Sequence, residues 1–234
     1  MGRLRSLLQR PNAGQLSRQN PAKNAACSEF EVDNWAVSQF VLQRLVPVVG
    51  VHPFPLHELM LMVAAVCRTQ PSQIFEWGTH IGKSARIFYE CAVHYEIDAD
   101  IHSSDLPDDV DHVEHPHAER GKLVRGLPRV HLHQGDGLDT SLEIWRSAGH
   151  RPRPLFLVDG DHEHASVLRE LTGIAREIRD ASILLHDSFN QSEASGYNVG
   201  PYRAIQDVLA TDPGRYRKVE SGLGLPGMTL LYPA

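Results

Sequence analysis

The sequence predicts an α/β fold in which helices cover both faces of a doubly wound, mostly parallel sheet of seven strands. From Ser72 onward, short apolar runs alternate with helical patterns, the clearest of which are 84–95 and 165–179. A helix near 201–210 then precedes two final runs that only a glycine-rich turn separates, which predicts a hairpin and one antiparallel strand near the C-terminus. The expected strands are QIFEW, ADIHSSD, RVHLHQGD, PLFLVDGD, ASILLHDS, RYRKVE and GMTLLYP.

The chain of 234 residues is long enough for one α/β domain with an N-terminal extension. Residues 1–30 are polar and are expected to form a disordered or extended tail. Apolar residues at helical spacing predict a first helix over 34–45, and Pro55 is placed to start the next one. Residues 31–70 are therefore expected to form a helical cap within a single domain, 31–234.

Composition excludes several classes of partner. The formal net charge of −6 provides no general positive field for nucleic acid. No run is apolar for long enough to cross a bilayer, and the basic start MGRLRSLLQR lacks the apolar core of a signal peptide. Cys27, Cys67 and Cys91 form no C-x-x-C pair, which indicates reduced thiols and a cytoplasmic protein.

Carboxylates stand at or just after the ends of five successive predicted strands. In an open parallel sheet, ligands bind at the carboxyl ends of the strands, so these side chains should meet at one edge. Any one of them alone could simply cap the helix that follows. Together they favour a ligand rich in hydroxyl groups or positive charge, or a metal ion. The five residues are Glu76, Asp105, Asp136, Asp159 and Asp187.

The loop after the first of these strands reads EWGTHIGKS. A dinucleotide-binding turn would read G-x-G-x-x-G, and a phosphate-binding P-loop would have one more residue between its glycines. The observed spacing places Glu76 before a wider loop that Gly78 and Gly82 bracket. Glu76 would repel an anion and favour an ammonium or sulfonium group, so the loop predicts a cationic ligand without phosphate.

With this acid and loop, the sequence resembles the S-adenosylmethionine-dependent methyltransferases of the Rossmann-like class. The resemblance implies that the loop backbone lines the methionine and ribose of the cofactor, with Glu76 near its charged amino-acid end. Lys83 and Ser84, at the helix start, would help to hold the methionine carboxylate. Asp105 would accept the ribose hydroxyls, and Asp136 would contact the adenine amino group, although Asp136 also suits a plain Asp-Gly turn. The cofactor-binding residues implied are Glu76, Gly78, Thr79, Gly82, Ser84, Asp105, Asp136 and Asp159.

The most specific segments are LFLVDGDHEHASVLREL and ILLHDSFNQ. They resemble a metal-assisted group of small-molecule O-methyltransferases, related to macrocin O-methyltransferase and to proteins labelled cephalosporin hydroxylase. The resemblance implies a divalent cation on Asp159 and Asp187. His186 departs from the group, which often has a second acid at this position, and is expected to be a further ligand or a base. Mg²⁺ is the first expectation, and the imidazole of His186 brings in Mn or Fe as alternatives. The implied catalytic residues are Asp159, His162 and His186.

The expected function is O-methylation of a hydroxylated small molecule or a sugar. A metal-dependent hydroxylase or other oxidoreductase, and a non-catalytic binding subunit with the same fold, remain as alternatives. The loop 188–203, with Asn190, Gln191, Tyr197 and Asn198, suits a lid that bonds a polyol. Neither the methyl acceptor nor the oligomeric state can be derived, so a homo-oligomer stays open. His80, His164 and the His/Asp-rich loop 108–121 receive no role.

Overall fold

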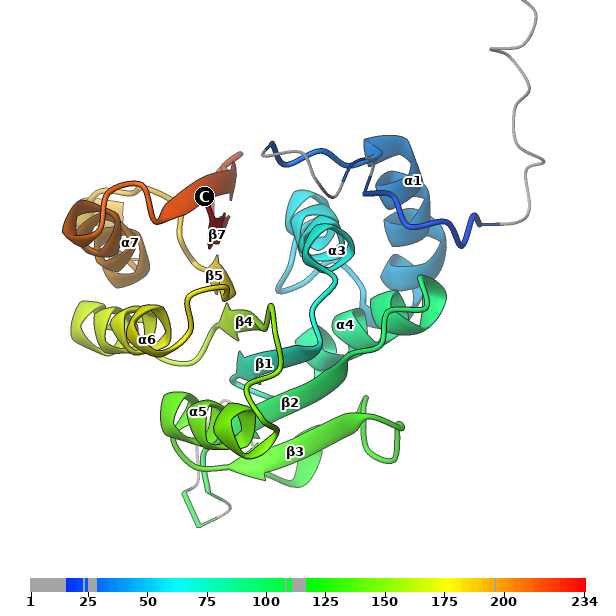
Figure 1. Cartoon of the computed structure of the whole chain (residues 1–234), viewed down its shortest axis with the longest axis horizontal. Helices are drawn as coiled ribbons and strands as arrows, with labels where there is room; N and C mark the ends of the chain where they lie inside the picture. Colours follow the sequence, from blue (N-terminus) through cyan, green and yellow to red (C-terminus); the bar gives the residue numbers. More distant parts are fainter. Residues whose placement is uncertain (1–15, 23, 25–28, 108, 111–116, 196) are drawn as a thin grey trace, which may run out of the picture.

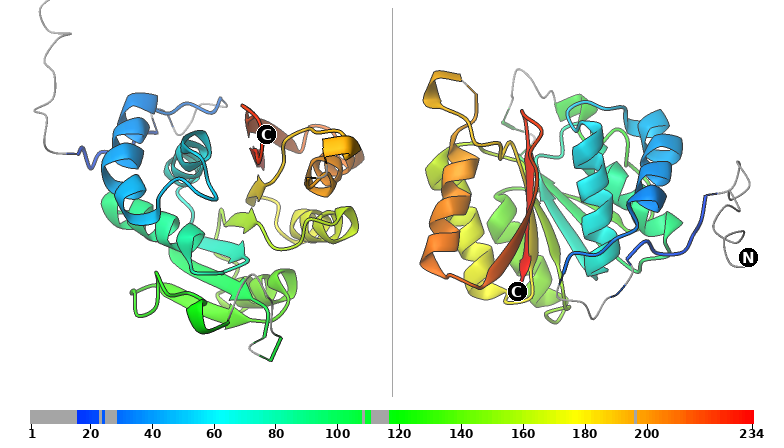
Figure 2. Two further views of the ribbon diagram at one scale, coloured as in Figure 1. Left: turned by 180° about the vertical axis from the view of Figure 1, so that it is seen from behind. Right: turned by 90° about the horizontal axis from the view of Figure 1, so that it is seen from above.

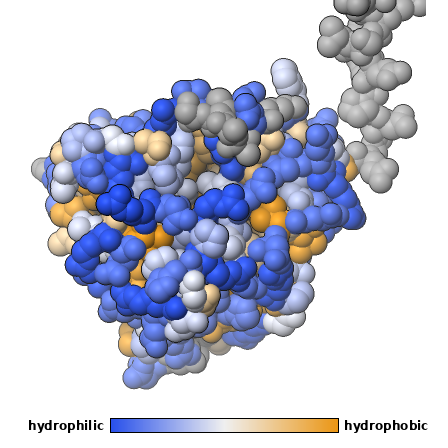
Figure 3. All heavy atoms as spheres, viewed as in Figure 1, coloured by the Kyte–Doolittle hydropathy of each residue, from blue (hydrophilic) through white to orange (hydrophobic). Residues whose placement is uncertain are grey.

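The computed structural model describes residues 16–22, 24, 29–107, 109–110, 117–195 and 197–234. Most of the expected tail 1–30, Cys27 and part of the loop 108–121 therefore lie outside the described residues. None of the helices in these ranges combines the length and the apolar character needed to span a bilayer. The face drawn in Figure 3 is mostly hydrophilic, with apolar side chains in small separate patches.

Seven strands form one sheet in the order β3-β2-β1-β4-β5-β7-β6. Strands β1 to β5 pair in parallel, and only β7 runs antiparallel to both of its neighbours, β5 and β6. The predicted fold class, including its one antiparallel strand, is confirmed. The strands are β1 Gln73–Trp77, β2 Asp100–Asp105, β3 Val130–Gln134, β4 Leu155–Val158, β5 Ser182–His186, β6 Tyr216–Ser221 and β7 Met228–Pro233.

Helices cover the sheet on both sides, as Figures 1 and 2 show. On one side lie α1 (Asn34–Phe40), α3 (Leu56–Thr69) and α4 (Lys83–His94). On the other side lie α5 (Gly137–Ser147), α6 (His164–Glu177) and α7 (Gly200–Thr211). Successive strand residues point to opposite faces, so the central strands must be apolar throughout. Leu155 and Leu157 thus join the first core, and Phe156 and Val158 join the second.

The N-terminal helical segment is continuous but changes its geometry along its length. Asp33 caps α1 by accepting hydrogen bonds from the backbone N–H groups of Trp35 and Ala36. A π-helical turn, η2 (Val41–Leu45), follows, and then the short α2 (Val46–Val49). Pro47 lacks an N–H and crowds the preceding turn, which accounts for the widened turn before it. The expected helix over 34–45 is therefore a helical segment over 34–49.

Other boundaries follow the sequence pattern closely, with one omission. Pro55 immediately precedes α3, as predicted. Helix α5 has no counterpart in the sequence-based prediction, although Leu138, Leu142 and Trp145 lie at helical spacing and are buried. Two short 3₁₀ turns, His117–Glu119 and Glu193–Ser195, complete the elements of the described chain.

The order of the strands in the sheet indicates where a ligand would bind. Strand β1 is paired with β2 on one side and with β4 on the other. After β1 the chain crosses over to β2, whereas after β4 it crosses over in the opposite direction, to β5, so the crossovers reverse between β1 and β4. Such a reversal opens a crevice at the carboxyl ends of the two strands, where open α/β sheets bind their ligands. A ligand site is therefore expected between the loops that follow β1 and β4.

The start of α5 is packed against the end of β1, and this contact can be tested. A Cβ at Gly137 would overlap the indole of Trp77. We expect Gly137→Ala to lower the free energy of unfolding by about 1–3 kcal/mol in urea denaturation, because the indole must move. Without the clash, alanine in a helix would instead be favourable by about 1 kcal/mol. In a Trp77→Leu background the same change should therefore be neutral or stabilising, and equal destabilisation in both backgrounds would contradict the packing.

Candidate functional site

The loop between β1 and α4 depends on two glycines with positive φ, at +83° for Gly78 and +87° for Gly82. A Cβ on Gly78 would lie 2.5 Å from the carbonyl oxygen of Asp159, so the loop rests directly on the end of β4. A Cβ on Gly82 would lie 2.8 Å from a methyl group of Val124. Both close approaches need glycine. The loop predicted to hold a cofactor is thereby fixed at the crevice between β1 and β4.

Glu76 lies beneath this loop and not on its surface, because its side chain is completely buried. The hydroxyls of Ser84 and Ser103 donate to its two carboxyl oxygens, and the hydroxyls of Thr79 and Ser103 are 2.6 Å apart. Burial raises the pKa of Glu76 to about 8, since the two serine hydrogen bonds only partly compensate for lost hydration. Glu76 thus ties the loop, the start of α4 and β2 together. Its expected contact with a cofactor stays a prediction.

Asp105, at the end of β2, already has partners within the chain. Its carboxylate accepts hydrogen bonds from the backbone N–H of His80, at 2.9 Å, and from that of Leu106, at 2.7 Å. The guanidinium of Arg120 lies 3.3 Å away. The arrangement clamps the loop of β1 to the residues after β2. The expected bonds to ribose hydroxyls would have to share this carboxylate, and they remain a prediction.

Asp136 has a structural role, which was one of the two alternatives that the sequence allowed. It is the N-cap of α5, accepting from the backbone N–H of Asp139 at 3.0 Å. Its other oxygen is paired with Arg169 of α6. Asp136 therefore joins two helices, and an additional contact with adenine is a prediction that these bonds do not address.

The ends of β4 and β5 bring four predicted residues together. The ring of His186 has Nδ1 3.0 Å from Asp159 Oδ1 and 3.6 Å from Asp187 Oδ2. The Nε2 atom of His162 lies 2.7 Å from Asp187 Oδ2 and 3.9 Å from Asp159 Oδ1. Asp159, His186 and Asp187 each direct one ligand atom into a group spanning no more than 4.8 Å, which could hold a metal ion. His164 is turned away and pairs with Asp207.

Electrostatics in this cluster are dominated by its acids. Hydrogen bonds to Asp159 and Asp187 raise the pKa of His162 to about 9. Burial opposes the charged form of His186, but Asp159 and its other acidic neighbours outweigh it and raise the pKa to about 10. Burial likewise works against ionised Asp187, yet His162 and His186 hold its pKa below the usual range. The cluster thus favours bound positive charge, whether as protons or as a cation.

Glu58 is the member of this site that sequence reasoning missed. It lies on α3, is fully buried, and its Oε2 is 3.1 Å from Nε2 of His186. Its other oxygen accepts the backbone N–H of Gly227 at 2.8 Å. The feature of the sequence that could have identified Glu58 is an acid inside the apolar helical stretch LHELMLMVAAVC. A carboxylate at such a position needs a partner, since an unpaired buried charge is costly.

The loop after β5 also reaches the cluster. Asp187 has a left-handed backbone, with φ of +54°. Its carboxylate accepts the hydroxyl of Tyr197 at 2.8 Å and the amide of Asn198 at 3.1 Å. Gln191 donates to the Asn198 carbonyl at 2.8 Å. The expected lid residues therefore lie beside the predicted metal ligands, although their contact with a substrate is untested.

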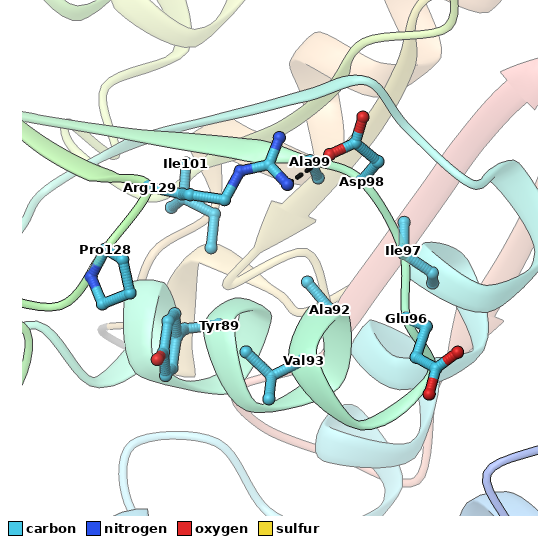
Figure 4. Close-up of a pocket in the computed structure, with 10 residues that line it drawn as sticks. All are labelled: Tyr89, Ala92, Val93, Glu96, Ile97, Asp98, Ala99, Ile101, Pro128 and Arg129. Atoms are coloured by element: carbon cyan, nitrogen blue, oxygen red, sulfur yellow. Dashed lines mark hydrogen bonds and ion pairs between the residues drawn. The ribbon is translucent and has the colours of Figure 1, made fainter.

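A separate cavity of about 290 Å³ lies at the opposite edge of the sheet (Figure 4). Tyr89 and Val93 of α4 form one wall, and Ile101 and Pro128 lie across from them. The ion pair between Arg129 and Asp98 bounds it. Its lining is largely apolar and carries no acid–histidine group, so it is not the counterpart of the cluster at the carboxyl edge.

Comparisons with known proteins agree with this geometry. Residues 75–189 match the family model described as a methyltransferase domain. No curated protein matches the sequence. Among solved structures, the TDP-rhamnose 3'-O-methyltransferase CalS11 of calicheamicin biosynthesis is similar, with a TM-score of 0.56, 16% identity, and coverage of 85% of this chain and 92% of that one.

Two further structures have the same fold. The O-methyltransferase TomG of Streptomyces achromogenes, involved in tomaymycin synthesis and solved with SAM, has a TM-score of 0.55 at 17% identity, covering 86% of this chain and 89% of that one. An O-methyltransferase from Bacillus cereus, solved with SAH, has a TM-score of 0.55 at 16% identity, covering 85% of this chain and 91% of that one. At these identities the likeness establishes the fold.

The burial of Glu76 predicts a specific dependence of stability on pH. Its pKa is about 8 in the folded protein against 4.5 for a solvated glutamate, so the folded state holds an extra proton between these limits. Stability should therefore fall as pH rises through this window, by about 1.4 kcal/mol per pH unit at most. In Glu76→Gln the part of this fall that Glu76 contributes should be lost, so urea denaturation between about pH 5 and about pH 8 should show a shallower decline than in the wild type. A decline should remain, because the pKa values of Glu170, His162 and His186 are raised as well.

The matched control is Glu96→Gln, which removes an exposed carboxylate that pairs with Arg18. It should follow the wild-type pH profile. Parallel profiles for wild type and Glu76→Gln would show that Glu76 is ionised in the folded protein, against the effect of its burial.

Proposed function

We propose that this chain, which has a Rossmann-like fold and matches a methyltransferase domain over residues 75–189, is an S-adenosylmethionine-dependent O-methyltransferase acting on a hydroxyl group of a small molecule or sugar. The similar enzymes from calicheamicin and tomaymycin biosynthesis support this choice of acceptor class. The chain's net charge of −6 argues against nucleic acid as the acceptor. We further propose that the protein works in the cytoplasm.

One observation carries the proposal more than any other. The acid–histidine cluster begins at Asp159, the residue whose carbonyl lies against Gly78 of the cofactor loop. Groups able to orient and deprotonate an acceptor are thus directly beside the place where the fold class binds its methyl donor. Methyl transfer to oxygen needs this proximity, because donor and acceptor must be aligned before reaction.

Divalent metal assistance fits the residues that are present. Two carboxylate oxygens, from Asp159 and Asp187, lie around one imidazole nitrogen of His186. Such a cluster needs bound positive charge, and a mixed oxygen–nitrogen donor set accepts Mg²⁺ less readily than Mn²⁺ or Fe²⁺. A bound cation would lower the pKa of an acceptor hydroxyl and orient it.

The residues of the chain divide the remaining tasks. Gly78, Thr79 and Gly82 would hold S-adenosylmethionine, which supplies a methyl group on a positively charged sulfur. His162 stands beside Asp159 and Asp187, which favour its protonated form. A cation held by these two acids would take over their charge and favour the neutral ring, which would then be the base for the acceptor's proton as the oxygen–methyl bond forms. Tyr197 and Asn198, bonded to Asp187, would place the lid loop over the acceptor.

A metal-dependent hydroxylase is the second candidate, because His186 gives the cluster an imidazole ligand typical of redox-active iron sites. Calorimetric titration with S-adenosylmethionine and S-adenosylhomocysteine separates the two. The proposal requires binding of both, and methyl transfer to at least one member of a panel of sugars, nucleotide sugars and phenols. Iron-dependent oxygen consumption without a methyl donor, together with no binding of either cofactor form, would overturn it.

Variants of the predicted metal ligands should separate chemistry from cofactor binding. Asp159→Asn and Asp187→Asn should each lower kcat by about 10²-fold or more, the scale of lost acid–base and orienting groups. The Kd for S-adenosylhomocysteine should change little in Asp187→Asn, since this residue is expected to bind only the metal, whereas Asp159 is also an expected cofactor contact. Asp207→Asn, which affects only the outward pair with His164, should behave as wild type. Full activity of both cluster variants in the presence of EDTA would contradict a metal-assisted mechanism.

Glu58 is expected to act through His186 as a positioning residue. Glu58→Gln keeps an acceptor for the Gly227 N–H but removes the charge facing Nε2 of His186. The change should weaken Mn²⁺ binding in calorimetry by about 10- to 100-fold, as for other residues that orient a metal-bound histidine. Glu90→Gln, in a buried acid on α4 that pairs with Arg44 and Arg86, is the matched control and should leave Mn²⁺ binding unchanged. Equal losses in the two variants would indicate a general loss of stability.

A further inference from the structure

Three histidines gather on β2 and β3, beside the lateral edge of the sheet. His131 and His133 are two residues apart on β3, so both side chains leave the same face of the strand. His102 on β2 is paired in register with His131, and it stacks on Phe75 of β1. Strand β3 is at the edge of the sheet. A His-x-His pair and a third histidine therefore share one face of two adjacent strands.

The spacing of two of these rings matches that of metal-bound imidazoles. Nδ1 of His102 lies 3.1 Å from Nε2 of His133. Two nitrogens bound to Zn²⁺ at about 2.0–2.1 Å in tetrahedral geometry are separated by roughly 3.3 Å. The His102–His133 pair thus has nearly the ligand spacing of a zinc site before any rearrangement.

The third ring needs one local movement. The ring of His131 is stacked on that of His102, with centroids 4.9 Å apart and an interplanar angle of 20°, and its centroid is 6.5 Å from that of His133. A stacked ring cannot direct its nitrogen at an ion between the other two. His131 is exposed on the edge strand, so rotation of its side chain can bring a nitrogen to that point without displacing the core.

A buried amide independently supports metal ligation by His102. Gln73 Nε2 lies 3.4 Å from His102 Nε2, while Gln73 Oε1 is buried without a hydrogen-bond partner. Rotation of the amide by half a turn would exchange its oxygen and nitrogen and let Oε1 accept a hydrogen bond from Nε2–H of His102. His102 would then present an unprotonated Nδ1 toward His133. Metal-bound histidines almost always have such an acceptor on their other nitrogen.

The surroundings leave room for an ion and a fourth ligand. His102 and His131 line a cavity of about 570 Å³ beneath the end of α5, into which Glu143 also faces (Figure 1 shows α5 beside β2 and β3). The positive charge of Arg151, which lines the same cavity, is matched by Asp100 at 2.5 Å. Burial and the neighbouring imidazoles lower the pKa of His102 to about 4, so its ring is neutral at neutral pH.

From this geometry we propose that His102, His131 and His133 bind a divalent transition-metal ion, for which Zn²⁺ is the best match, with a fourth position open to water or Glu143. Three imidazoles are typical ligands of Zn²⁺ and poor ligands of Mg²⁺. The site is separate from the methyl-transfer site, because its histidines lie on β2 and β3, whereas Asp159 and Asp187 follow β4 and β5 on the far side of β1. An ion here joins the edge strand β3 to β2.

The test uses the full chain without a histidine tag, stripped of metal and carrying Asp159→Asn and Asp187→Asn to remove the other cluster. Titration with Co²⁺ should give visible absorption bands of tetrahedral strength at one ion per chain, and Zn²⁺ should displace Co²⁺ and raise Tm. His131→Ala removes an exposed ligand without a core cavity and should weaken Co²⁺ binding at least 10-fold. Gln73→Leu should weaken it by about 10- to 100-fold.

His150→Ala, an exposed histidine outside the group, is the matched control and should bind Co²⁺ within about twofold of the parent. Circular dichroism checks that each variant is folded. The proposal is overturned if the parent shows no tetrahedral bands, or if His131→Ala and His133→Ala together leave them unchanged. Either result would leave the methyltransferase proposal untouched, because that proposal is judged by binding of S-adenosylmethionine at the opposite edge.

Discussion

The contact of His186 with Asp159 on one side and Glu58 on the other is the interaction on which the arrangement at the carboxyl ends of β4 and β5 depends. Through Asp159 the imidazole is joined to the end of β4, and through that residue's carbonyl to Gly78 of the cofactor loop. Through Glu58 it is joined to α3 and to Gly227 before β7. One ring therefore links the N-terminal helices, the loop after β1 and the antiparallel hairpin. Movement of any of these elements would change the position of the nitrogen that faces Asp159.

Through this link the N-terminal helices contribute a side chain to the acid–histidine cluster, which is not evident from their sequence. A methyltransferase domain matched over 75–189 omits α1 and α3 altogether. Yet the carboxylate facing His186 comes from α3, and Phe54, just before that helix, contacts the same ring edge-on at 4.8 Å. The acid–histidine cluster thus includes contacts from residues that lie before the matched domain. The helical cap over 31–70, which remains a proposal as a domain division, borders this cluster.

The sequence was sufficient for the sheet, because buried parallel strands are short apolar runs that stand out between helical patterns. It also singled out Asp159, His162, His186 and Asp187, since residues after parallel strands must meet at one edge. It could not show that Asp105 and Asp136 have partners such as Arg120 and Arg169, which come from distant parts of the chain. Glu58 was missed for the same reason: its partner His186 is 128 positions away, and helix periodicity describes only which face is buried. Local pattern determines elements, whereas the pairing of charges requires the tertiary arrangement.

The two candidate metal sites differ in the donor atoms that they offer, and this difference bears on which ion each could retain. The cluster after β4 and β5 offers Asp159 and Asp187 oxygens with one imidazole, whereas β2 and β3 offer imidazoles. Affinity for nitrogen donors rises from Mn²⁺ and Fe²⁺ toward Zn²⁺, while oxygen donors suit Mg²⁺ and Mn²⁺. A zinc ion would therefore be held preferentially by the histidines of the edge strand, leaving the acid-rich cluster to a harder cation.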